Sequence, residues 1–158
     1  DFIINKKFNA VLGTEWLSGK DYDTQSTNNK SFSPFYGTNH KFNGYMDYFF
    51  VGNHFNTFGL NDYYLKTTTK FNPKSSLMVN LHAFTTNGKL ANDQSSYLGT
   101  EADLVFAHKF SKLFALNVGH SFMFASSSME ALKALNTPKN TQTWSWIQLN
   151  FVPWFRLK

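Results

Sequence analysis

Apolar and polar residues alternate with a period of two in six stretches of this chain. The clearest stretch interleaves Leu77, Val79 and Leu81 with the polar residues Asn80 and His82. Because successive side chains of a β-strand point to opposite faces, this alternation predicts strands with one apolar and one polar face. The predicted strands comprise residues 7–18, 58–71, 76–86, 97–110, 113–125 and 141–157.

Several residues depart from the simple alternation. Leu60 and Tyr63 would both belong to the apolar face but have opposite parity, so we expect an irregularity near Asn61. His120 falls on the apolar face of its strand. Pro153 cannot donate a backbone hydrogen bond, so we expect it near a strand end or at an irregularity.

Short and long connections alternate along the chain. This order predicts an antiparallel up-and-down arrangement with all short turns at one end and all long loops at the other. The short turns are Asn5-Lys6, Asn72-Pro73-Lys74-Ser75 and Ser111-Lys112, and the long connections are residues 19–57, 87–96 and 126–140.

The last long connection, residues 126–140, predicts a short helix. Ser127 and Glu130 have the spacing of a capping box, in which each side chain bonds the backbone N–H of the other. Asn136 and Pro138 then favour the end of the helix.

The predicted strands have the pattern of strands that span a membrane. No run reaches the about 18 to 20 uninterrupted apolar residues of a membrane helix. Aromatic residues nevertheless make up 18% of the chain, and no charge interrupts the apolar face of the best strands, which includes Leu98 and Leu104. Strands with one face in lipid and one in water are typical of an outer-membrane β-barrel, so we expect an all-β fold of the transmembrane, antiparallel, up-and-down type in the cell outer membrane.

The connections predict an orientation in that membrane. Bacterial barrels have short periplasmic turns and long extracellular loops, so residues 19–57 and 126–140 are expected outside the cell. Strict alternation places Trp144, Trp146 and Trp154 on the water face, and they join an aromatic girdle only if the last strand is irregular at its ends.

Six strands are fewer than the about eight of the smallest membrane barrels. Phe2-Ile3-Ile4 is interpreted as the tail of a preceding strand. We therefore expect residues 1–158 to form a single partial domain, the C-terminal part of a larger barrel.

Overall hydrophobicity does not separate a membrane protein from a soluble one here, since hydrophobic content of 42% and a mean hydropathy of −0.36 would also suit a soluble protein. Other features of the composition exclude several classes of protein. The chain has no cysteine, so disulfides and Cys-based zinc sites are excluded. A net charge of +5 comes from scattered lysines, which argues against a nucleic-acid partner.

The sequence contains no convincing catalytic or cofactor motif. His120 and Ser121 are adjacent, so strand geometry points them to opposite faces and they cannot act as base and nucleophile. The five histidines lack metal-ligand spacing. We expect no enzyme activity, no metal and no cofactor.

The polar face carries charged and amide side chains that predict a hydrated interior, because charges are costly in lipid. An alternative is a plugged interior in which opposite charges on adjacent strands form salt bridges. The candidate pore-lining residues are Glu15, Asp62, Lys66, Lys70, Asn80, His82, Glu101, Asp103, Lys109, Gln148 and Asn150.

Residues 32–50 form a long polar and aromatic segment that can narrow a pore by folding into it. An alternative is an external loop that packs on itself through Phe35, Phe42, Phe49 and Phe50. The candidate constriction residues are Tyr36, His40, Lys41, Asp47 and Tyr48.

The run from Phe32 to Phe49, with Tyr-Gly-Thr-Asn-His-Lys-Phe as its most specific part, resembles Bacteroidota outer-membrane porins of the alginate-export type. The runs Gly59–Leu65 and Gly119–Ala125 are similar to the same group. The resemblance implies a monomeric passive channel for anionic or sugar-like solutes with a charged pore. The arginine-rich constriction of the alginate exporter has no counterpart, since Arg156 is the only arginine, so the broader class of porins is implied rather than alginate export.

Two functions follow from these observations. The first is a porin-like channel for transport of small hydrophilic solutes, with mixed charge along its lumen. The second is a plugged structural barrel that acts as a membrane anchor or platform in a larger secretion or surface complex. A soluble barrel would not need tryptophan at both strand ends. The expected partners are membrane lipid, lipopolysaccharide, the solute, the remaining strands of the barrel and such a complex.

Overall fold

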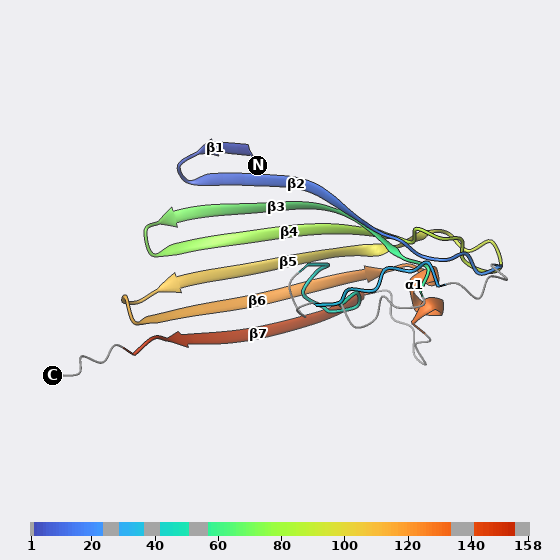
Figure 1. The fold of residues 1–158 in the computed structure, drawn as a ribbon. Coiled ribbons are helices and arrows are strands. Elements are labelled where there is room, and N and C mark those ends of the chain that lie inside the picture. The colour runs from blue at the N-terminus through green and yellow to red at the C-terminus, as the bar shows by residue number, and fades with distance from the viewer. Residues whose placement is uncertain (1, 24–28, 37–41, 51–56, 134–140, 154–158) are drawn as a thin grey trace.

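The chain folds into an antiparallel sheet in which every strand pairs with its neighbours in sequence (Figure 1). The computed structural model describes residues 2–23, 29–36, 42–50, 57–133 and 141–153. Six long strands form a meander, and a four-residue strand is added at one edge. The elements are β1 (Phe2–Asn5), β2 (Phe8–Leu17), β3 (Leu60–Asn72), β4 (Ser75–Thr85), β5 (Tyr97–Lys109), β6 (Phe114–Ala125), α1 (Ser127–Leu132) and β7 (Thr141–Phe151).

The six predicted strands are confirmed. Their ends differ from the prediction by at most two residues, except that β7 ends at Phe151 and not at residue 157. Pro153 follows this strand, as expected for a residue that cannot donate to the ladder. β1 pairs with β2 as a hairpin across Asn5-Lys6, and β1 and β7 are the two edges of a sheet that is not closed into a barrel.

All charged side chains of β2 to β7 lie on one face of the sheet, which we call the charged face. The opposite, apolar face has no Asp, Glu, Lys or Arg on these strands, and many of its large side chains are exposed, Ile147 by 72%. These exposed side chains of the apolar face are Leu12, Trp16, Tyr63, Leu65, Phe71, Leu81, Phe106, Val118, Phe124, Ile147, Leu149 and Phe151.

One predicted face assignment, that of Leu60, is wrong. The ladders run without a shift through Asn61, so Leu60 belongs to the charged face. The β3–β4 ladder shifts instead between Lys70 and Asn72. The β4–β5 ladder shifts between Phe84 and Thr85, where the partners change from Gly99 to Tyr97. Leu98 sits at this shift and is fully buried. Both leucines are buried because the hydrophobic core lies at their end of the sheet.

Histidines on the apolar face have polar neighbours across the ladder. His120 lies opposite Ser145, with the imidazole Nδ1 2.6 Å from the hydroxyl oxygen. The same ring packs edge-on against Phe122. His108 is paired with Ser75 in the same way, at 2.8 Å. The polar atoms therefore satisfy one another within an otherwise apolar surface.

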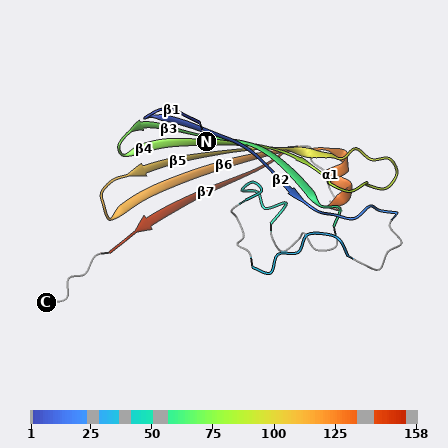
Figure 2. The same ribbon diagram turned by 45° about the horizontal axis from the view of Figure 1, so that its top comes forward.

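The sheet has two different ends, the turn end with its short connections and the loop end with its long ones (Figure 1). The described residues 29–36 and 42–50, between β2 and β3, lie on one side of the sheet (Figure 2). The hydrophobic core is at the loop end, where strand residues meet the connections. It consists of Leu17, Phe49, Leu60, Phe84, Leu90, Leu98, Met123 and Met129.

The predicted short helix is confirmed as α1, but its cap is different. Ser126, not Ser127, is the N-cap, and its hydroxyl accepts a hydrogen bond from the Met129 N–H. Glu130 is therefore one residue too far along to complete a capping box. Asn136 and Pro138 lie outside the described residues. No helix in the described part of the chain is long and apolar enough to cross a membrane.

Candidate functional site

All eleven candidate pore-lining residues lie on the charged face. They divide between the two ends of the sheet. Toward the loop end, Asp62, Asn80, His82, Glu101 and Asp103 are buried, and Glu15 is half-buried. Toward the turn end, Lys70, Lys109 and Gln148 are exposed, while Lys66 and Asn150 are half-buried.

Residues 42–50 cover the loop end of the charged face, and Asn43 is their first anchor. The Asn43 amide donates hydrogen bonds to Glu15 Oε2 at 2.7 Å and to Asp62 Oδ2 at 3.2 Å. Glu15 and Asp62 face each other across the β2–β3 ladder. One neutral donor therefore bridges two carboxylates that would otherwise repel each other.

Glu101 is the second anchor of this segment. Its Oε1 accepts the backbone N–H groups of Tyr45 and Met46 at 2.6 and 2.9 Å. Gly44 passes directly over the carboxyl group with φ of +81°, and a Cβ at this position would lie 2.5 Å from Glu101 Cδ. Only glycine combines this backbone conformation with such a close approach.

Tyr45 lies among polar and aromatic groups of the wall. Its ring meets Trp146 edge-on, with 6.5 Å between the ring centres. Burial raises the pKa of the Tyr45 phenol, and the charge of Asp103 raises it further. A hollow of about 280 Å³ is lined here by Tyr45, Trp144, Trp146 and Gln148.

The end of the segment is fixed by Tyr48 and Phe49. The Tyr48 hydroxyl donates to the side chain of Gln142 on β7. The Phe49 ring packs on Phe84 with 4.7 Å between the ring centres. Lys133 donates to the Tyr48 carbonyl, and its ammonium lies over the Phe49 ring. Burial lowers the pKa of Lys133.

Polar pairs under this cover hold the wall residues in place. His82 Nδ1 lies 2.9 and 3.0 Å from the two carboxylate oxygens of Asp62. The Ser121 hydroxyl donates to Asp103 Oδ1 at 2.5 Å. His82 and Asp62 thus lie within ion-pair distance of each other on the charged face.

The candidate constriction residues have different positions. Tyr48 is anchored as described above, and Asp47 adopts φ of +57° in the same segment. Tyr36 is 96% exposed. His40 and Lys41 lie outside the described residues. Residues 42–50 contact the sheet and do not pack only on themselves, since Phe49 reaches Phe84.

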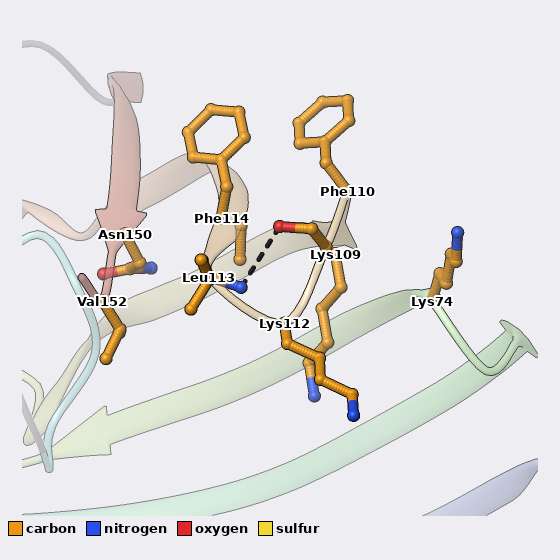
Figure 3. Close-up of a pocket in the computed structure, with 10 residues that line it drawn as sticks. Lys74, Lys109, Phe110, Lys112, Leu113, Phe114, Asn150 and Val152 are labelled. Atoms are coloured by element: carbon orange, nitrogen blue, oxygen red, sulfur yellow. Dashed lines mark hydrogen bonds between the residues drawn. The ribbon is translucent and has the colours of Figure 1, made fainter. Parts of the chain in front are cut away.

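The turn end of the charged face carries lysines (Figure 3). A cavity of about 520 Å³ is bordered by Lys74, Lys109 and Lys112. Figure 3 shows the side chains of Lys109 and Lys112 pointing away from the rings of Phe110 and Phe114, whereas Lys74 lies to one side of them. The two rings stack on each other at 5.1 Å between centres. Lysines and aromatic rings thus border the same cavity at this end.

Several residues of the site were not predicted from the sequence. Asn43, Gly44 and Tyr45 were within the predicted segment but received no role, although Asn-Gly is a common turn signal. The sequence placed Trp146 and Ser121 on the polar face but did not predict the residues that they contact. Their roles depend on contacts between distant parts of the chain, which a pattern of alternation does not contain.

Among the described residues, no group of three or more His, Asp or Glu side chains has the geometry of a metal site. No protein-family model, no curated protein and no solved structure matches this chain. The function must therefore be argued from the geometry of the sheet and its cover.

Proposed function

We propose that this chain forms part of the wall of an outer-membrane β-barrel that acts as a porin-like channel for small hydrophilic solutes. The proposal includes a place among the alginate-export type of Bacteroidota porins, based on the resemblance of residues 32–49. Membrane lipid and lipopolysaccharide would contact the apolar face, and the solute would pass along the charged face.

The observation that carries this proposal is the separation of the two faces. The apolar face of β2–β7 lacks acidic and basic residues other than histidine and exposes large side chains from edge to edge. In water such a surface would be covered or would aggregate, whereas lipid is a suitable solvent for it. The charged face requires water or polar partners.

The edges of the sheet support closure with further strands. The outer backbone groups of β1 and β7 have no neighbouring strand in the sheet. Unpaired backbone groups are costly in lipid, so only a closed barrel satisfies them. The remaining strands of the same barrel would pair with these two edges.

Residues 42–50 would narrow the lumen at its outer end, because they lie across the charged face and are held by Glu15, Asp62 and Glu101. The hollow beside them presents the indole rings of Trp144 and Trp146 and the amide of Gln148. Ring faces combined with a few hydrogen-bonding groups suit sugar-like solutes.

Conductance of the purified protein in a planar bilayer tests the channel. Replacing residues 43–48 by a Gly-Ser linker of the same length removes the anchors to the wall and keeps Phe49 in the core. We expect the wild type to conduct and the variant to conduct several-fold more, because a constriction contributes most of the resistance of a pore. The control replaces residues 91–95 of the β4–β5 connection by a Gly-Ser linker of the same length, and it should conduct as the wild type does.

One observation favours the second function, a plugged barrel that serves as an anchor or platform in a larger complex. Residues 42–50, the cover, are joined to the charged face of the sheet by the hydrophobic core, through Phe49, as well as by hydrogen bonds. Such a cover can close a lumen permanently. A protein that does not conduct either before or after the replacement of residues 43–48 would favour this platform and exclude the channel.

A further inference from the structure

Three buried oxygen atoms on the charged face accept no hydrogen bond from the described residues. They are Asn80 Oδ1, Glu101 Oε2 and Asp103 Oδ2, on side chains that are 3%, 0% and 0% exposed. Asn80 lies directly across the β4–β5 ladder from Asp103. The carboxyl groups of Glu101 and Asp103 are within hydrogen-bonding reach of each other. Buried acceptors without a donor are destabilising, so this cluster needs either a proton or a cation.

The other oxygen of each carboxylate is already engaged. Glu101 Oε1 accepts two backbone N–H groups, and Asp103 Oδ1 accepts the Ser121 hydroxyl. These bonds fix the orientation of both groups and leave one oxygen of each available. The nearby basic side chains have other positions: Lys66 over the Tyr64 ring, His82 against Asp62, and Lys133 at the Tyr48 carbonyl.

We propose that Asn80, Glu101 and Asp103 bind a calcium-like divalent cation beneath residues 42–50. Every available ligand atom is oxygen, and carboxylate and amide oxygens are the ligands that Ca²⁺ prefers. The Tyr45 phenol interacts with Asn80 and with the charge of Asp103, so a further oxygen lies beside the cluster. Two carboxylates would balance a divalent charge, and water would complete the shell.

Calcium suits this set better than magnesium. The ligands come from two neighbouring strands and have unequal side-chain lengths, which gives an irregular arrangement. Ca²⁺ accepts irregular coordination, whereas Mg²⁺ requires a nearly ideal octahedron. Zn²⁺ is disfavoured because the cluster offers neither thiolate nor imidazole.

The cation would also attach the cover to the wall. Glu101 holds the backbone of Tyr45 and Met46, and Asn80 is beside the Tyr45 phenol. A cation between Asn80, Glu101 and Asp103 would therefore fix β4, β5 and residues 42–50 together. Because a ligand that binds only the folded state stabilises it, Ca²⁺ should raise the melting temperature.

Terbium luminescence tests the site on the purified protein in detergent. Tb³⁺ replaces Ca²⁺ at oxygen sites and is sensitised by nearby aromatic rings, here Tyr45 and Trp146. We expect saturable emission that Ca²⁺ displaces. Asp103→Asn should weaken Tb³⁺ binding by more than about tenfold, since it removes a charged ligand. Asp93→Asn, in the exposed β4–β5 connection, is the matched control and should bind as the wild type does.

A second measurement uses only the wild type, so it does not depend on the folding of a variant. Its melting temperature should be higher in Ca²⁺ than in chelator. If Tb³⁺ gives no saturable emission and melting responds to pH but not to Ca²⁺, a shared proton neutralises the cluster and the cation proposal is wrong. Equal Tb³⁺ binding by Asp103→Asn and the wild type would also overturn it. These outcomes are independent of conductance and therefore of the channel.

Discussion

Two glycines on the charged face each lie under the ring of the residue directly across the ladder. Gly13 is opposite Tyr64, and Gly119 is opposite Trp146. A Cβ at either glycine would overlap the facing ring. The rings can lie against the backbone only because these positions have no side chain, an arrangement that compensates glycine in a strand.

Gly119→Ala is expected to displace the Trp146 indole and to lower the free energy of unfolding by about 1–3 kcal/mol, as for other overpacked sites. Tryptophan emission and urea unfolding measure the two effects. Asn117→Ala is the control on the same strand and face, and it should have little effect. When Gly119→Ala is introduced into the Trp146→Ala variant, it should lower the free energy of unfolding much less than in the wild type, because the ring that clashes with the new Cβ is absent. A fully additive loss would contradict the contact.

At the scale of the elements, alternation was sufficient to predict the strands. Each face of β2–β7 has one chemical character along most of its length, so the period of two was visible in the sequence. Alternation failed at Leu60, which is buried at the loop end, as Leu98 is, by connections that cover the sheet there. Where connections bury a strand end, an apolar residue can lie on either face, so parity does not encode its side of the sheet.

The contacts of residues 42–50 with the sheet also could not be predicted from the sequence. Asn43 is 28 residues from Glu15, and Tyr45 is 56 residues from Glu101. Neither contact has a periodic signal, because both depend on how a long connection returns to the sheet. The sequence did indicate a long aromatic segment with a role, and it placed the eleven candidate wall residues on one face, but it did not show which of them the segment covers.

Cysteine labelling tests the two faces, since the chain has no native cysteine. Gln148→Cys and Ile147→Cys form a matched pair at one depth of β7, on the charged and the apolar face. We expect a membrane-impermeant maleimide to label position 148 in lipid, and position 147 only after unfolding. Asn80 and Asp103 are unsuitable positions because both are buried. Equal labelling of 147 and 148 in the folded protein would contradict the membrane orientation.

At the scale of the whole molecule, charge is separated along the charged face. The carboxylates Glu15, Asp62, Glu101 and Asp103 lie toward the loop end. Lysines begin at Lys66, which is in the row of Asp103 with Asn80 between them, and continue through Lys70 and Lys109 to the turns. Two lysine-lined cavities, of about 520 and 610 Å³, lie at the turn end.

In the proposed channel this separation would create an electric field along the lumen, positive at the turn end. A field of this kind concentrates anions at one mouth and makes the passage of ions unequal in the two directions. The acidic end is covered by residues 42–50 through hydrogen bonds to Glu15 and Glu101, whereas Lys70 and Lys109 are exposed. The lysines should therefore dominate ion preference.

The variant Lys70→Gln/Lys109→Gln is accordingly expected to reduce anion preference and current asymmetry together. Reversal potential and current–voltage curves in a salt gradient measure both effects. They are recorded below about 0.1 M salt, where the screening length exceeds about 10 Å. The control Lys20→Gln/Lys89→Gln removes charge from the loop end. If the control shifts the reversal potential as much as the turn-end variant does, net charge and not its distribution sets the preference, and the field argued here is absent.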